Sequence, residues 1–141
     1  MATQRYSRAY NSPVGPTYTM TGSGVIGFGK LVKIDSAGYV ELATGTGNPA
    51  PMGIAIANEV LADTNSAEQY ADGDPVTVEA IVPGGIYNLF KTTGGNITIN
   101  NFVVPSTSGN VASAASATLR SVYTIAQAIE TGSGWVKFQA L

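Results

Sequence analysis

The stretch that decides the fold reads Leu31-Val32-Lys33-Ile34-Asp35-Ser36-Ala37-Gly38-Tyr39-Val40-Glu41-Leu42. Two strand-like runs, Leu31–Ile34 and Tyr39–Leu42, flank Asp35–Gly38, whose residues are typical of tight turns. Both runs are rich in residues that favour extended backbone. The stretch therefore predicts a β-hairpin.

A similar hairpin pattern begins later in the chain, at Phe102. When the chain is slid along itself without a gap until Leu31 lies over Phe102, Leu31–Glu59 aligns with Phe102–Glu130, and eight of the 29 positions are identical. The alignment predicts an internal repeat of two hairpin-containing units. The alternative is that the same turn chemistry produced two similar hairpins independently. The identical pairs are Val32/Val103, Gly38/Gly109, Val40/Val111, Ala43/Ala114, Ile54/Ile125, Ala55/Ala126, Ala57/Ala128 and Glu59/Glu130.

Short strand-like runs bounded by glycine, proline or asparagine continue along residues 25–141, in keeping with a chain of 17 glycines and 7 prolines. The predicted fold is all-β: a small β-barrel or β-sandwich built from the two units, forming a single domain over 25–141. Two stretches, Thr64–Ala71 and Ala112–Arg120, are compatible with short helices instead.

Residues 1–24 are predicted to form an extended N-terminal arm, because they contain two prolines and show no helical or strand period. Three tyrosines and two arginines lie in this arm without any acidic residue. Both residue types are enriched at protein interfaces. The arm is therefore predicted to bind the partner or a neighbouring copy, although a solvated terminus is the alternative. The predicted partner-binding residues are Arg5, Tyr6, Arg8, Tyr10 and Tyr18.

Composition excludes many kinds of chemistry, because the chain has neither histidine nor cysteine. Disulfides, Cys/His metal sites and imidazole-dependent catalysis are all ruled out. We therefore expect no enzyme activity and no cofactor. The formal net charge of −2 is distributed as +3 over residues 1–30, −7 over 31–80 and +2 over 81–141. No basic stripe indicates nucleic-acid binding, and no apolar run is long enough to indicate membrane insertion.

Two short motifs resemble ligand-binding motifs but lack a feature that such binding requires. Gly22–Gly27 fits the G-x-G-x-x-G dinucleotide pattern, but a strand pattern follows it where that motif requires a helix. Asp72-Gly73-Asp74 offers carboxylates, but their spacing does not fit a calcium-binding loop, so a solvated acidic loop is expected. Trp135 lies in a predicted strand and is expected to belong to the core rather than to a ligand platform.

From Gly29 to Leu141 the chain resembles the small head-decoration, or capsid cement, proteins of tailed bacteriophages. The resemblance implies a β-rich structural domain on the outside of an expanded icosahedral head. It also implies a clamp that binds the major capsid protein, stabilises the shell and has no catalytic residues. The residues that carry the resemblance are Gly29–Asp35, Pro51–Ala55, Ala71–Val78, Ile125–Glu130 and Gly132–Phe138.

The resemblance further implies location in the virion, on the capsid exterior, after synthesis in the host cytoplasm. The expected partners are the major capsid protein and other copies of the chain, in a homo-oligomer for which a trimer is expected and a dimer stays open. Two other functions are compatible with the sequence. One is another phage structural component, such as a tail or fibre-attachment part, and the other is a carbohydrate-binding β-sandwich module.

Overall fold

The computed structural model describes residues 15–44, 53–56, 69–91, 95–114 and 124–141. Almost all regular structure in these segments is strand, which confirms the predicted all-β fold. In chain order the elements are β1 (Thr17–Thr21), β2 (Ile26–Gly27), β3 (Leu31–Ile34), β4 (Val40–Leu42), β5 (Gly53–Ala55), β6 (Gln69–Tyr70), β7 (Pro75–Ala80), β8 (Ile86–Lys91), β9 (Phe102–Pro105), the 3-10 helix η2 (Thr107–Gly109), β10 (Val111–Ser113), β11 (Ala126–Ala128) and β12 (Gly134–Ala140).

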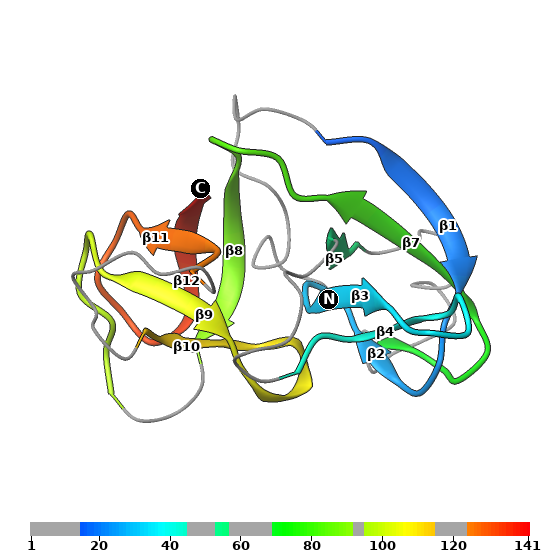
Figure 1. Cartoon of the computed structure of the whole chain (residues 1–141). Coiled ribbons are helices and arrows are strands. Elements are labelled where there is room, and N and C mark those ends of the chain that lie inside the picture. Colours follow the sequence, from blue (N-terminus) through cyan, green and yellow to red (C-terminus); the bar gives the residue numbers. More distant parts are fainter. Residues whose placement is uncertain (1–14, 45–52, 57–68, 92–94, 115–123) are drawn as a thin grey trace.

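The strands form two halves that lie side by side (Figure 1). The N-terminal sheet has the strand order β1-β7-β5-β3-β4, and β2 pairs with β6 beside it. The second half is a closed barrel with the order β10-β8-β12-β11-β9. The chain thus completes one half before it begins the other, as expected for a protein made of two successive units.

The two halves have the same topology. Starting from β8, the barrel runs β8-β12-β11-β9-β10, which matches β1-β7-β5-β3-β4 strand for strand. The barrel closes through a parallel pairing of Val111 with Lys91. In the N-terminal sheet, a parallel bridge between Gly22 and Val40 joins the corresponding edges. The two halves therefore share one strand order, and a single parallel pairing links the edges of each.

The register of pairing refines the predicted repeat. The hairpins β3–β4 and β9–β10 correspond as predicted, with Leu31 over Phe102, because the bond from Ala43 N to Leu31 O (2.9 Å) recurs from Ala114 N to Phe102 O (3.0 Å). The next strand does not follow the same alignment. Leu31 pairs with Ile54 in the first half, whereas Phe102 pairs with Gln127 in the second, so Ile54 corresponds to Gln127.

The predicted pairs Ile54/Ile125 and Ala55/Ala126 are therefore wrong by two positions. The physical reason is the length of the connection before the strand. Residues 43–52 separate β4 from β5, whereas the longer segment 114–125 separates β10 from β11. A gapless alignment has no means of detecting that difference. The pair Ala57/Ala128 includes a residue outside the described ranges.

The predicted arm ends before Gly24. β1 pairs with β7 along its whole length, from Thr17 opposite Glu79 to Thr21 opposite Pro75. Pro16 O accepts a hydrogen bond from Ala80 N at 2.9 Å, and Gly15 is buried. The chain from Gly15 onward is thus built into the sheet, where Tyr18 and Met20 alternate with three threonines and pack against the core.

Neither helical alternative holds in the described part of its stretch. Gln69 and Tyr70 form β6, which pairs with Gly27 and Ile26. Val111–Ser113 forms β10, which pairs with β9. Tertiary pairing therefore overrides the helix propensity of the alanine-rich stretch.

Two clusters of buried residues form the core. One fills the N-terminal sheet and includes Tyr70, whose hydroxyl donates to Ile56 O at 2.5 Å. The other fills the barrel around Phe138, and it also takes in Leu31, Ala43 and Ile54 from the first half. Apolar burial therefore continues across the boundary between the halves, so that they pack as one body.

The turn of the second hairpin makes the junction between the halves. Gly109 N donates to Ala43 O at 2.8 Å, and Lys30 Nζ donates to Asn110 Oδ1. The same ammonium lies 4.5 Å from the ring centroid of Phe90 and 5.5 Å from that of Trp135. Burial lowers the pKa of Lys30. A cation held over two aromatic rings is attracted by their electron-rich faces, so this lysine fastens the N-terminal sheet to the barrel.

Candidate functional site

Most of the exposed large apolar side chains of the described residues lie at one end of the N-terminal sheet. Val25 is 51% exposed, Ile34 42% and Tyr39 45%. The fourth, Ile99, is 48% exposed and belongs to the barrel half. Isolated exposed apolar residues are ordinary on a protein surface, but several at one end indicate an interaction surface.

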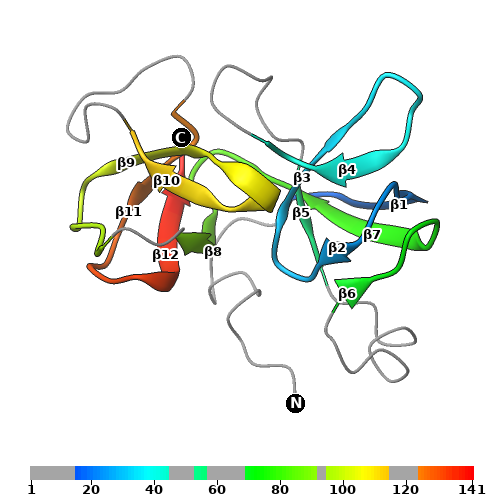
Figure 2. The same ribbon diagram turned by 90° about the horizontal axis from the view of Figure 1, so that it is seen from below.

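Backbone hydrogen bonds bring three loops together at this end. Ser23 N donates to Val40 O at 2.7 Å, which holds the loop after β1 against β4. Gly22 N donates to Asp74 O at 2.9 Å, and Gly73 N donates to Gly22 O at 3.2 Å, which adds the turn between β6 and β7. We call the combined surface of residues 22–25, 34–39 and 71–74 the distal end. Figure 2 shows the β3–β4 hairpin extending away from the barrel, whereas the β9–β10 hairpin points toward the sheet.

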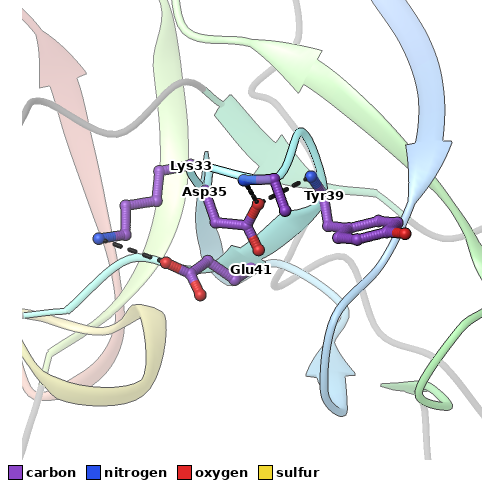
Figure 3. Close-up of polar contacts among 5 residues, drawn as sticks. Lys33, Asp35, Tyr39 and Glu41 are labelled. Atoms are coloured by element: carbon purple, nitrogen blue, oxygen red, sulfur yellow. Dashed lines mark hydrogen bonds and ion pairs between the residues drawn. The ribbon is translucent and has the colours of Figure 1, made fainter.

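The hairpin turn of the distal end has a fixed backbone (Figure 3). Asp35 Oδ1 accepts hydrogen bonds from Ala37 N at 2.8 Å and from Tyr39 N at 2.9 Å. Asp35 N donates to Tyr39 O at 2.8 Å, and Gly38 has a φ of +88°, which favours glycine. Tyr39 is thus exposed on a preorganised turn, and a side chain on such a support loses little backbone entropy on binding.

A single ion pair lies farther along the same hairpin. Lys33 Nζ is 3.4 Å from Glu41 Oε1, and both side chains are partly exposed (Figure 3). Exposed pairs of this kind contribute about 0–1 kcal/mol. The charges of Lys33 and Glu41 therefore balance each other on the two strands behind the turn.

A surface pocket of about 260 Å³ lies in the distal end. Asp72 stands at its edge, where Asp72 Oδ1 accepts a hydrogen bond from Gly24 N at 2.8 Å. Asp74 Oδ2 accepts one from Ala71 N at 2.8 Å. Both carboxylates thus support turns, and no cluster of three potential metal ligands occurs within the described ranges. The pocket is lined by Thr21, Gly22, Ser23, Tyr39, Asp72 and Gly73.

Of the residues predicted to bind a partner, Tyr18 alone lies within the described residues. Arg5, Tyr6, Arg8 and Tyr10 lie outside the described residues. Tyr18 is half-buried in β1 and packs against the core of the N-terminal sheet. Burial raises the pKa of Tyr18, and its enclosed hydroxyl has no hydrogen-bond partner among the described residues. Tyr18 is therefore a sheet residue rather than an anchor on a free arm.

Sequence reasoning missed the distal end, although one signal was present. Ile34 and Tyr39 flank a polar turn, a place where a solvent-facing hairpin usually carries polar side chains. Val25 and Asp72 had no such signal, because only the fold brings them beside that turn. In the part of the chain that is described, no helix is long and apolar enough to span a membrane.

Two comparisons with known proteins give matches, one to a family and one to a solved structure. A family model described as structural cement protein (E217 gp24/Pam3 gp6) matches residues 3–140. The chain is similar to the N base of the head fiber gp8.5 of bacteriophage phi29, with a TM-score of 0.63 and 12% identity over 89% of this chain and 93% of that one. Likeness at this identity shows a shared fold. A search among curated protein sequences finds no match. Because the family model covers nearly the whole chain, this protein belongs to the family of phage structural cement proteins and is a structural protein of the phage capsid.

Proposed function

We propose that the protein binds the outer surface of the phage head through its distal end and stabilises the shell formed by the major capsid protein. Membership of the cement family supports association with the capsid. The observation that carries the choice of surface is the exposure of Val25, Ile34 and Tyr39 at one end of the sheet, beside turns whose backbones are fixed by hydrogen bonds. Apolar and aromatic side chains on a rigid support are the usual anchors of tight interfaces.

The N-terminal arm supplies a second contact in this proposal, through Arg5, Tyr6, Arg8 and Tyr10. The chain enters β1 at Gly15, next to Ala80, whereas the distal loop begins after Thr21. The length of β1 lies between them, a span of roughly 17 Å. Two contacts separated in this way let one copy bridge neighbouring shell subunits, and linked contacts bind far more tightly than either does alone.

Self-association completes the proposed function, with a trimer as the expected form. The low content of charged residues, 11% of the chain, favours repeated close contacts between copies. Sedimentation equilibrium of the purified protein, alone and with heads, measures its oligomeric state directly. A monomer at high concentration together with isolated single copies on the shell contradicts this part of the proposal.

Co-sedimentation with expanded empty heads tests the proposed surface. We expect the wild type to pellet with heads, and the double variant Ile34→Thr/Tyr39→Ser to bind at least about tenfold more weakly, because two central apolar anchors are removed. Ile99→Thr is the matched control, since it removes an equally exposed apolar residue from the barrel half. Equal binding by the double variant and the control contradicts the assignment of the distal end.

A further inference from the structure

The barrel half contains a site for a cationic side chain that is filled within the chain. Lys30 Nζ occupies it, against the rings of Phe90 and Trp135 and the side-chain oxygen of Asn110. The two rings meet edge to face, with centroids 5.3 Å apart. This site lies at the end of β8 and beside the turn of the β9–β10 hairpin.

Strand register locates the equivalent place in the N-terminal sheet. Phe90 pairs with Trp135 as Thr21 pairs with Pro75, so Phe90 corresponds to Thr21. Asn110 corresponds to Tyr39, because Ser106 N donates to Asn110 O as Asp35 N donates to Tyr39 O, both at 2.8 Å. Thr21 and Tyr39 both line the distal-end pocket. The pocket therefore contains the counterparts of Phe90 and Asn110, two of the three residues around Lys30 Nζ.

The chemistry of the pocket also suits a cation. Tyr39 offers an exposed aromatic ring, and Thr21 and Ser23 offer hydroxyl groups that accept hydrogen bonds. Asp72 Oδ1 accepts from Gly24 N, while Asp72 Oδ2 accepts no hydrogen bond from the described residues. In the barrel site, two aromatic rings and the neutral amide of Asn110 surround the cation. The pocket has one ring, that of Tyr39, and the negatively charged carboxylate of Asp72.

The barrel half of a second copy carries no matching cation for this pocket. In the alignment that places Leu31 over Phe102, Lys30 corresponds to Asn101, which carries no charge. A second copy that docked its barrel half in the manner of the N-terminal sheet would therefore present an amide instead of an ammonium. The distal end is also the surface assigned above to the shell.

We propose that the distal-end pocket, bounded by Tyr39 and Asp72, accepts a lysine or arginine side chain of the major capsid protein. The proposal rests on the proposed function, since it names what the distal end recognises on the shell. It specifies an electrostatic contact within an otherwise apolar surface, which fixes the orientation of the bound copy.

Head binding by Asp72→Asn tests the proposal. The amide retains an oxygen that accepts from Gly24 N, so the loop is preserved while the charge is lost. We expect binding to weaken about tenfold, with a shallower dependence on salt. Glu41→Gln is the matched control, because it removes one charge from the same sheet outside the pocket. If both variants bind alike while the wild type binds heads, the pocket proposal is overturned and the proposed function stands.

A second measurement does not depend on heads. Titration of the full chain with the tripeptide Gly-Arg-Gly, followed by amide resonances of Gly24 and Gly73, reports the pocket itself. Saturable shifts that disappear in Asp72→Asn support the cation site. Absence of shifts in the wild type overturns it.

The arm of another copy is the competing source of the cation. Combining Asp72→Asn with Arg5→Gln/Arg8→Gln distinguishes it, because independent contacts weaken binding additively. Additive losses support a capsid side chain. If the arm substitutions add nothing to Asp72→Asn, the arm occupies the pocket and the assignment to the capsid protein is overturned.

Discussion

The two hairpin turns of the protein have equivalent positions and opposite environments. In the turn after β9, Gly109 is buried at the junction and its N–H donates to Ala43 O of the other half, while Thr107 and Ser108 are exposed. The turn after β3 extends from the distal end with Gly38 and Tyr39 exposed. One hairpin turn of the duplicated fold thus contacts the other half of its own chain, and the equivalent turn faces solvent. Two units with the same topology can therefore differ in role, because one turn stabilises the fold and the other stays exposed.

The junction also makes the halves depend on each other. Leu31, Ala43 and Ile54 belong to the N-terminal sheet by chain order but pack into the barrel core. Among the described residues, none of the distal end belongs to either buried apolar cluster. Its loops are held by hydrogen bonds of the backbone and of aspartate side chains. We therefore expect substitutions in the core and the junction to affect stability, and substitutions at the distal end to affect binding.

The largest effect is expected from the equivalent core residues Phe138 and Val78. Phe138→Ala should lower the free energy of unfolding by about 3–5 kcal/mol, and Val78→Ala by about 2–3 kcal/mol because fewer buried atoms are lost. Both residues are fully buried. Urea denaturation followed by Trp135 fluorescence and by circular dichroism should give one coincident transition in each variant. Two separate transitions would break the claim that the halves unfold together.

The equivalent glycines Gly109 and Gly38 provide the next test. Both have positive φ, +72° and +88°, so alanine is strained by about 1–2 kcal/mol at either site. At Gly109 a Cβ atom would also lie 2.8 Å from Leu31 O and 2.9 Å from Lys30 Cβ, whereas at Gly38 it meets no atom of the described residues within 4 Å. Gly109→Ala should therefore cost about 2–5 kcal/mol and Gly38→Ala about 1–2 kcal/mol. Equal losses in urea denaturation would show that the second turn is not docked.

The smallest effect concerns the two lysines near β3. Lys30→Met should lower stability at neutral pH by about 1 kcal/mol, since the cation–π contacts are lost, and Lys33→Met by less, since its ion pair is exposed. Burial lowers the pKa of Lys30 in the folded protein below 10.5, so the unfolded chain binds the proton more tightly. Wild-type stability should therefore rise relative to Lys30→Met as the pH increases through the lowered pKa toward 10.5. A pH-independent difference between the two contradicts a partly buried ammonium at the junction.

The sequence was informative wherever the evidence was local. The turn residues Asp35–Gly38 and the repeated hairpin pattern predicted the strands and much of the duplication. The sequence alignment placed β5 two positions away from its true match in β11. The connection before β11 is longer than the one before β5, and an alignment without gaps cannot allow for that difference. β1 was missed because its alternation rests on only two apolar residues, Tyr18 and Met20, at the end of a stretch that otherwise shows no period.

The candidate site was harder to predict, because it is assembled from segments far apart in the chain. Asp72 and Tyr39 border one pocket only because parallel bridging at Gly22 and Val40 closes the sheet. The unusual composition of the arm instead predicted that the tyrosines and arginines before Gly15 contact a partner. Their role as partner contacts stays a prediction, whereas Tyr18 belongs to the sheet.

The orientation of the protein on the shell tests the central claim most directly. Electron cryomicroscopy of decorated heads can resolve which half faces the capsid. The account predicts that the distal end, with Ile34 and Tyr39, lies against the major capsid protein and that the barrel half points outward. Density showing the barrel half against the shell, with the distal end exposed, would contradict it.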